Sequence, residues 1–210
     1  PKTPNTLFIK GDISNSKIIS RAFKDRIDLI FHLAAYFANQ NSVEHPIDDL
    51  MSNGIGMINL LEAAVKNNVK KFIYFSTSCI YKNKNQKLKE SDLDLQFETP
   101  YAISKYIGEK YVNFYSHYYK LPTVILRIFN SFGPGEKQGK YRNVIPNFFH
   151  KAIKNESLVI TGTGKETRNF TFVEDIVRGA FLAAASEKAV GKVINLGGKR
   201  EVSILELARL

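Results

Sequence analysis

Tyr101 and Lys105 are four residues apart in a segment whose apolar spacing predicts a helix, so the phenol and the ammonium share one face. A nearby cation favours the phenolate of a tyrosine, whose ordinary pKa is near ~10. A tyrosine that moves protons near neutral pH also needs a second hydrogen-bond donor. Ser76, Thr77 and Ser78 supply hydroxyls upstream, although an isolated cluster of this kind also forms ordinary turns. Together these residues predict general acid–base chemistry at Tyr101.

An alternation of strands and helices must position these side chains. Short apolar runs predict strands at 6–9, 28–33, 71–75 and 123–129. Segments with helical spacing lie between them at 16–25, 46–67 and 99–119. This alternation predicts an α/β fold, a Rossmann-like doubly wound parallel sheet with helices on both faces. Ligands of such sheets bind at the carboxyl ends of the strands, which is where the hydroxyl cluster lies.

The sequence changes in character after Asn130. Glycines between 133 and 139 predict a long loop, followed by a helix at 144–154, a strand at 158–160 and a turn at 161–164. A helix at 173–185, a strand at 192–195 and a helix from 202 complete the chain. We therefore expect a Rossmann-like domain over 1–130 with part of 170–195. Residues 131–169 and 196–210 would belong to a small C-terminal substrate-binding lobe.

Composition excludes several classes of protein. The 210 residues contain one cysteine, Cys79, and four scattered histidines, so neither a disulfide framework nor a metal site is predicted. A reducing, cytoplasmic location fits this cysteine usage. No apolar run is long enough for a membrane span. The net charge is +10, but the basic stretches at 82–89 and 137–142 lack interleaved aromatic residues, so a solvated surface is favoured over nucleic-acid binding.

The ordered motifs resemble the extended short-chain dehydrogenases/reductases that act on nucleotide sugars, the epimerase/dehydratase group, and most of all its UDP-glucose 4-epimerases. The motifs are Gly-Asp-Ile at 11–13, His-Leu-Ala-Ala at 32–35, Asn-Gly-Ile-Gly-Met at 53–57, Ser-Thr-Ser-Cys-Ile-Tyr at 76–81, Tyr101 with Lys105, Leu-Arg-Ile-Phe-Asn at 126–130, Asn-Val-Ile-Pro at 143–146 and Arg-Asn-Phe-Thr-Phe-Val-Glu-Asp at 168–175.

The resemblance implies a nucleotide-sugar substrate and NAD as cofactor, with NADP not distinguished. It implies that Thr77, Tyr101 and Lys105 are catalytic, with Tyr101 as the general base and Lys105 holding the ribose hydroxyls while lowering the Tyr101 pKa. The implied cofactor-binding residues are Asp12, Ile13, Leu33, Ala34, Ala35, Asn53, Ser76, Tyr101 and Lys105. The implied substrate-binding residues are Thr77, Ser78, Asn130, Asn143 and Arg168. The resemblance also implies a homodimer built from the helices that contain Tyr101 and residues 53–67.

One part of the family pattern is not found in the sequence. No Gly-x-x-Gly-x-x-Gly turn between a strand and a helix is present, since the glycines at 54 and 56 lie in a helical segment. We therefore expect a fragment without its N-terminal βαβ unit and its C-terminal end, one that binds the cofactor poorly. A catalytically inactive nucleotide-binding or nucleic-acid-binding module is the alternative, against which the Thr77, Tyr101 and Lys105 set argues.

The residues after Thr77 favour one reaction of the family. The 4,6-dehydratases have an Asp-Glu pair there and the decarboxylases a Glu, whereas this chain has Ser78 and Cys79. GDP-fucose synthases pair a similar cysteine with a histidine, but the matching position is Asn143, so we interpret Cys79 as a packing residue. The simplest remaining chemistry is 4-epimerisation of a UDP-hexose through a 4-keto intermediate. Dehydration, decarboxylation and GDP-fucose-synthase-like epimerisation remain the alternatives.

Overall fold

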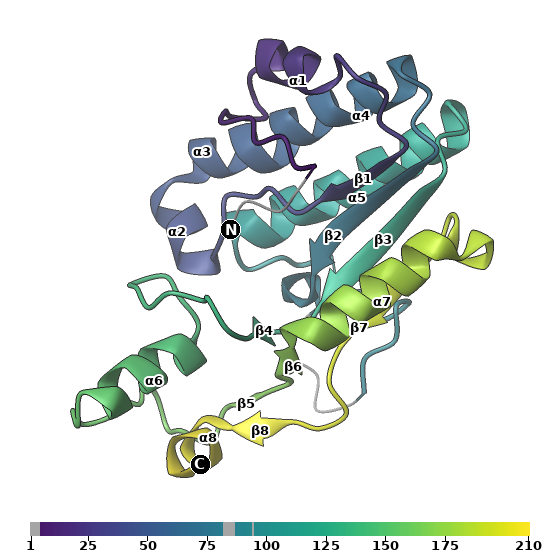
Figure 1. Ribbon diagram of the computed structural model, residues 1–210. Helices are drawn as coiled ribbons and strands as arrows, with labels where there is room; N and C mark the ends of the chain where they lie inside the picture. Colours follow the sequence, from purple (N-terminus) through teal and green to yellow (C-terminus); the bar gives the residue numbers. More distant parts are fainter. Residues whose placement is uncertain (1–4, 82–86, 94) are drawn as a thin grey trace.

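A four-stranded parallel sheet forms the centre of the protein. The computed structural model describes residues 5–81, 87–93 and 95–210. The sheet order is β1-β2-β3-β7, and each neighbouring pair is parallel (Figure 1). The strands are β1 (Leu29–His32), β2 (Lys71–Thr77), β3 (Thr123–Ile128) and β7 (Val193–Leu196). The strands expected at 28–33, 71–75, 123–129 and 192–195 are confirmed, and β2 extends to the predicted hydroxyl cluster.

Helices cover both faces of this sheet, as a doubly wound fold requires (Figure 1). On one face lie α1 (Ser16–Ala22), α4 (Gly56–Lys66) and α5 (Pro100–Tyr118), and on the other lies α7 (Val173–Ala185). The side chains of β2 alternate between them. Phe72 and Tyr74 are fully buried in the cluster shared with α4 and α5, whereas Ile73 is buried in the cluster shared with α7.

The helix expected over 46–67 is continuous but changes its winding. Pro46 is in the first turn of α3 (Pro46–Leu50), a π-helical turn η1 follows (Met51–Ile55), and α4 continues the helix. A short helix α2 (Asn39–Glu44), which was not predicted, precedes them. Helix α5 begins as its sequence indicates, because the Thr99 side chain accepts a hydrogen bond from the Ala102 backbone N–H and Pro100 is in the first turn.

Helix α5 packs unusually close to β2. A Cβ atom added at Gly108 would lie 2.3 Å from the hydroxyl oxygen of Tyr74. That hydroxyl donates a hydrogen bond of 3.1 Å to the backbone carbonyl of Lys105 on the same helix. Glycine at 108 therefore sets the distance at which Lys105 is held over the sheet.

A group of shorter elements lies at the end of the molecule where the sheet strands terminate (Figure 1). It contains α6 (Val144–Ile153), α8 (Ile204–Arg209), the parallel pair β4 (Ser131–Phe132) and β6 (Thr171–Phe172), and the antiparallel pair β5 (Thr167–Arg168) and β8 (Val202–Ser203). Two 3-10 turns, η2 (Ser78–Ile80) and η3 (Glu187–Ala189), lie elsewhere. The strand predicted at 158–160 is wrong, since these residues have no regular structure and Val159 is 63% exposed.

The strand predicted at 6–9 is also wrong. These residues have no regular structure, and Leu7 and Phe8 are 76% and 83% exposed. Strand β1 is at the edge of the sheet, and no strand of the described residues pairs with its outer side. The apolar side chains at 6–9 suit a strand, but no strand of the described residues pairs with this segment to form a ladder. Helix α1 follows as predicted, but its N-cap is Asn15, whose side chain accepts from the Lys17 N–H.

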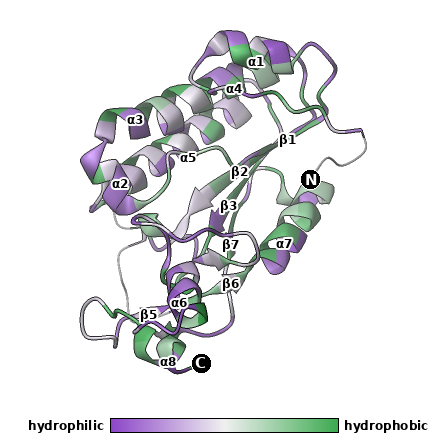
Figure 2. Cartoon of the chain, turned by 60° about the vertical axis from the view of Figure 1, so that its left-hand side comes forward, coloured by the Kyte–Doolittle hydropathy of each residue, from purple (hydrophilic) through white to green (hydrophobic). Residues whose placement is uncertain are grey.

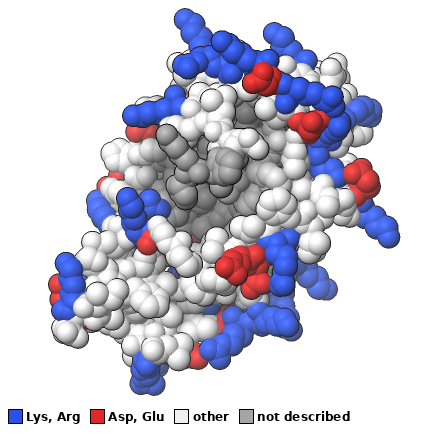
Figure 3. All heavy atoms as spheres, viewed as in Figure 1, with Lys and Arg blue, Asp and Glu red and all other residues white. Residues whose placement is uncertain are grey.

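The basic residues are spread over the surface. Lysine and arginine side chains are distributed around the outline in Figure 3, with acidic side chains among them. Of the basic stretch at 82–89, residues 82–86 lie outside the described part of the chain. None of the helices in the described residues combines the length and the apolar character needed to cross a bilayer.

Candidate active site

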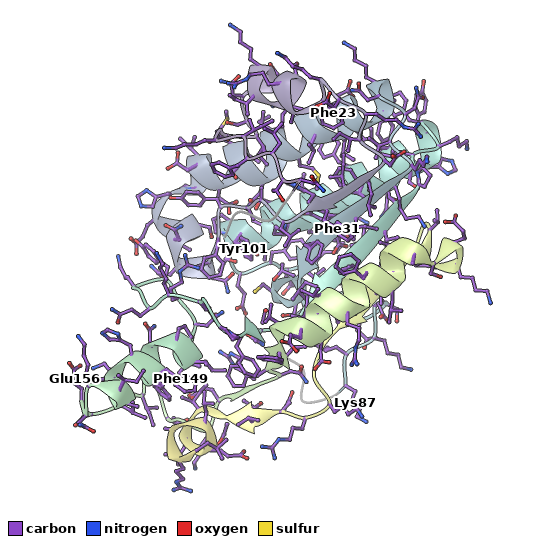
Figure 4. All side chains as sticks on the ribbon, viewed as in Figure 1. Phe23, Phe31, Lys87, Tyr101, Phe149 and Glu156 are labelled. Carbon is purple, nitrogen blue, oxygen red and sulfur yellow. The ribbon has the colours of Figure 1, made fainter. Side chains whose placement is uncertain are left out.

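A cavity of about 850 Å³ opens at the carboxyl ends of β1, β2 and β3, beside α7. Figure 4 labels Tyr101, in the first turn of α5, and Phe31, on β1. The cavity brings together most of the residues that the sequence indicates: Leu33, Ala35, Ser76, Thr77, Ser78, Tyr101, Lys105, Asn130, Asn143 and Arg168. These residues come from segments more than 130 positions apart, so the parallel sheet gathers them as expected.

Four of the predicted cofactor-binding residues do not line this cavity: Asp12, Ile13, Ala34 and Asn53. Asp12 is exposed, and its carboxylate accepts the Ser14 backbone N–H at 2.8 Å. Ile13 packs against the core cluster beneath α4. Asn53 is buried in η1, where its side-chain oxygen accepts the Tyr36 N–H at 2.8 Å. Asn53 thus supports the loop that follows β1 and has no direct access to the cavity.

Tyr101 is held at the cavity by its own backbone and by Thr77. Its N–H donates to the Ser42 hydroxyl of α2 at 3.0 Å. Burial raises the pKa of Tyr101 above its ordinary value, Cys79 adds to the rise, and a hydrogen bond with the Thr77 side chain opposes it. Desolvation of the phenolate dominates the net shift. The lowering of this pKa by Lys105 stays a prediction.

Lys105 is buried, with 2% of its surface exposed, and its ammonium lies 4.4 Å from the centre of the Tyr74 ring. Burial lowers the pKa of this ammonium to about 7, while Glu109 and Asp49 act in the opposite direction. Among the described residues, no oxygen accepts a hydrogen bond from the Lys105 Nζ, although the side chain lines the cavity. An ammonium that lines the cavity fits a ligand that presents hydroxyl oxygens, such as the ribose of a dinucleotide.

A buried ionic network supports the wall of the cavity behind Ser76. Glu109 accepts the Ser76 hydroxyl at 2.6 Å and is paired with Arg127, whose Nε and Nη2 donate at 2.9 and 2.8 Å. Arg127 also donates to the Tyr81 hydroxyl at 2.7 Å. This network was not predicted from the sequence. An arginine inside the apolar run at 123–129 and a glutamate four residues after Lys105 were the signals that could have indicated it.

The rim of the cavity is formed by a loop that reaches across to α2. Lys140 Nζ lies 2.9 Å from a carboxylate oxygen of Glu44, and the Tyr141 hydroxyl donates to the same carboxylate at 2.5 Å. The Arg142 guanidinium lies over the Phe37 ring at 5.0 Å. This loop belongs to the stretch that was interpreted as a solvated surface, and Lys140 and Arg142 are indeed exposed, although they also line the cavity.

The charged side chains lining the cavity are Lys105, Lys140, Arg142 and Arg168, and no carboxylate of the described residues lines it. Asn130 donates to the Asn169 carbonyl at 3.2 Å, and Asn143 donates to Glu136 at 3.2 Å. Arg168 donates to the Thr167 carbonyl at 2.8 Å and is otherwise exposed. This distribution of charge favours an anionic ligand such as a diphosphate.

Cys79 faces the cavity. It lies in η2, directly after β2, is exposed, and receives a long hydrogen bond of 3.7 Å from the Asn39 side chain. The interpretation of Cys79 as a packing residue is therefore wrong. The physical reason is that the chain turns at the end of β2, so that Thr77, Ser78 and Cys79 all border the cavity while Ile80 enters the core.

Comparison with known proteins assigns the family. The model of the NAD dependent epimerase/dehydratase family matches residues 2–197. The chain belongs to this family. The residues described above fit NAD, because the cavity is lined by the Lys105 ammonium, by the hydroxyl cluster at the end of β2 and by apolar side chains.

Relatives within the family catalyse different reactions. The solved structure of epimerase Mth375 from Methanothermobacter thermautotrophicus has a TM-score of 0.96 and 46% identity, covering 100% of this chain and 63% of that one. A UDP-N-acetyl-alpha-D-glucosaminuronate decarboxylase of Bacillus cytotoxicus is 39% identical over 87% of this chain and 57% of its own length. A dTDP-D-glucose 4,6-dehydratase of Dictyostelium discoideum is 34% identical over 99% of this chain and 50% of its own length. The chain thus spans about half to two thirds of each relative's length.

Proposed function

We propose that the chain is the catalytic part of a nucleotide-sugar 4-epimerase that uses NAD and acts on a UDP-hexose. The observation that carries this proposal is the cavity at the end of β2, where Thr77, Tyr101 and Lys105 lie together and Ser78 and Cys79 occupy the next two positions. No carboxylate of the described residues lines that cavity. Epimerisation at one carbon needs a single proton-transfer group, whereas dehydration also needs an acid and a base beside the catalytic threonine.

Three side chains, those of Tyr101, Thr77 and Lys105, have proposed roles in the reaction. NAD, when bound, supplies the reversible oxidation of the sugar carbon. Tyr101 takes the proton of the C4 hydroxyl, and Thr77, hydrogen-bonded to the phenol, holds the same hydroxyl oxygen. Lys105 orients the ribose hydroxyls through its unshared N–H donors. Tyr101 then returns the proton after the keto sugar has presented its opposite face, for which a cavity of about 850 Å³ has room.

The cationic rim supports a diphosphate-linked substrate. Arg168 presents a planar fork that matches phosphate oxygens, and it comes from β5 and lines the same cavity as Tyr101. The proposed orientation has the sugar near Thr77 and the diphosphate near Arg168. Asn130 and Asn143, both on the lining, are the proposed polar contacts between these two ends.

A panel of UDP-, GDP- and dTDP-sugars, assayed with the full-length enzyme and NAD, tests the reaction. We expect interconversion of C4 epimers of a UDP-hexose, with no water or carbon dioxide released and no net accumulation of reduced cofactor. Release of water with formation of a 4-keto-6-deoxy sugar would replace the proposal with a dehydratase. Release of carbon dioxide from a uronic acid substrate would replace it with a decarboxylase. Turnover of none of these sugars, with binding retained, would favour the inactive nucleotide-binding module.

We further propose that the enzyme is a homodimer assembled through α5 and the continuous helix formed by α3, η1 and α4, which contains the expected residues 53–67. These helices lie side by side (Figure 2) and carry large hydrophobic side chains that remain exposed. The exposed residues are Ile47, Leu50 and Met51 on one side and Ile103, Tyr111, Phe114 and Tyr118 on α5. A contiguous apolar surface of this kind favours a partner, and a second copy of the same helices would supply one.

A further inference from the structure

Asp49 is a buried carboxylate that forms no salt bridge within the described part of the chain. Only 1% of its surface is exposed, and its Oδ1 accepts the Asn53 side-chain amide at 2.9 Å. Burial raises the pKa of Asp49, and a hydrogen bond from Ser104 opposes the rise. No lysine, arginine or histidine of the described residues forms a salt bridge with it. A buried carboxylate with hydrogen bonds but no counter-ion is costly, so its presence beside the cavity calls for an explanation.

The hydrogen bonds of Asn53 connect Asp49 to the helix of Lys105. The Asn53 amide donates to Asp49 and also to the Ser104 hydroxyl at 3.1 Å. Ser104 immediately precedes Lys105, and α3 packs against α5 at this point. The charge of Asp49 acts on both Lys105 and Tyr101. Asp49 is therefore close enough to the proposed catalytic groups to influence their ionisation.

The other titratable groups around Lys105 bring little uncompensated charge. They are His32 on β1, Tyr74 on β2, and Tyr101 and Glu109 on α5. Burial lowers the pKa of His32 to about 3 and raises that of Tyr74, so both are neutral near pH 7. Glu109 acts on Lys105 more strongly than Asp49 does, but its carboxylate oxygens are already engaged by Arg127 and Ser76. Asp49 is thus the negative charge around Lys105 that no other cation compensates.

We propose that Asp49 is a positioning residue that keeps the Lys105 ammonium charged and oriented toward the cavity at neutral pH. The proposal deepens the proposed function and rests on it, because the charge matters for catalysis only if Lys105 binds the cofactor ribose. Asp49 itself does not line the cavity, so it acts through Lys105. Helix α3 and the π-helical turn η1 would then hold the Asp49 carboxylate next to α5, the helix that contains Lys105.

Asp49→Asn removes the negative charge but keeps the shape of the side chain, because an asparagine oxygen can still accept hydrogen bonds from Asn53 and Ser104. The full-length protein, labelled with [ε-13C]lysine, is titrated by NMR, and the spectrum of Lys105→Met assigns the Lys105 signal. We expect the Lys105 midpoint to fall by roughly one pH unit in Asp49→Asn, since losing a nearby opposite charge disfavours the protonated amine. Asp48→Asn makes the same chemical change on the exposed neighbour and should leave the midpoint in place.

An unchanged Lys105 midpoint in Asp49→Asn would overturn the proposal. Asp49→Ala, which removes the charge without an amide, must shift the midpoint in the same direction, and thermal unfolding checks that both variants are folded. The affinity for NAD, measured across the same pH range, distinguishes failure of the proposed role of Asp49 from failure of the proposed contact between Lys105 and the cofactor. If the midpoint moves but NAD affinity does not follow it, Asp49 still controls Lys105 while the proposed contact of Lys105 with the cofactor fails.

Discussion

Tyr101 and Thr77 come from different elements and meet at the mouth of the same cavity, with Lys105 one helical turn behind them. The neutral phenol is strongly favoured in this setting, since burial raises its pKa. Ionising the buried phenol is costly. A ligand that places positive charge or hydrogen-bond donors near the phenol would have to offset the cost of ionisation before Tyr101 acts as a base. The catalytic state is thus expected to form only in the ternary complex.

Replacing the phenol tests this directly. Tyr101→Phe in the full-length enzyme should lower kcat by about 10²–10⁴-fold, because the proton-transfer group is lost while the ring remains. The thermal unfolding midpoint should stay close to that of the wild type, since the Tyr101 backbone contact with Ser42 is retained. Tyr106→Phe, on the next turn of α5, is the control and should keep near-normal turnover. Wild-type rates in Tyr101→Phe would contradict the assigned role.

Lys105 should lower stability at neutral pH. Its pKa is about 7 in the folded protein against 10.5 for an ordinary lysine, so between these values the unfolded chain binds a proton that the folded chain does not. Stability should therefore rise with pH across this window. We expect Lys105→Met to unfold at a higher temperature than the wild type at pH 7 while losing activity, with the difference shrinking toward pH 10. Lys110→Met, on the exposed side of α5, should show no such pH-dependent difference.

At the residue scale, sequence reasoning identified the groups at the ends of strands but not those behind them. Thr77, Tyr101 and Lys105 could be predicted because strand order and helix periodicity bring them to one edge. The roles of Asp49 and Glu109 could not be predicted, because they depend on how deeply each carboxylate is buried and on whether a cation compensates its charge. Asp12 and Ile13 were assigned from resemblance alone, and they lie away from the cavity.

Among the elements, β2, β3 and α5 are joined by the buried pair of Glu109 and Arg127, whose side chains are 3% and 2% exposed. Such a pair contributes little relative to apolar residues of the same size, but removing one partner leaves a buried charge. This pair therefore acts mainly to fix how α5 lies on the two central strands.

A double-mutant cycle measures that arrangement. Arg127→Met alone should lower the free energy of unfolding by about 3–5 kcal/mol, because Glu109 is left buried and unpaired. The double variant Glu109→Leu with Arg127→Met should recover most of this loss. Arg178→Met breaks an exposed pair with Asp175 and should cost less than about 1 kcal/mol. If the double variant were as unstable as the single one, the pair would have a role beyond charge compensation.

Helices and strands could be predicted where the local sequence pattern agrees with the packing that the fold provides. The helices predicted at 99–119, with its cap at Thr99, and at 173–185 are present as α5 and α7. The strands expected at 6–9 and 158–160 have suitable side chains but no partner strand in the described chain, and pairing cannot be read from composition. The π-helical turn at η1 likewise depends on tertiary contacts, among them the hydrogen bond from Asn53 to Ser104.

At the scale of the whole molecule, the exposed apolar surface of α3 and α5 predicts self-association. Phe114, which is 49% exposed on α5, is placed to lie within the proposed interface. Phe114→Glu should convert a dimer to a monomer in sedimentation velocity at micromolar concentration, because a desolvated carboxylate opposes association. Val43→Glu introduces the same charge at an exposed residue of α2 and should leave the dimer intact. A wild-type monomer would contradict the proposed assembly.

The open side of β1 has a consequence for how these 210 residues behave in concentrated solution. Leu29 at the start of this strand and Leu33 directly after its end are 38% and 60% exposed, and within the described chain the outer backbone groups of β1 have no strand to pair with. An apolar strand with a free edge accepts further strands from any molecule that presents one. Association of this kind would grow with protein concentration and would persist at high salt, because backbone hydrogen bonds and not charges hold it. A polypeptide that pairs with the edge of β1 in solution would therefore also prevent the sheets of different molecules from associating.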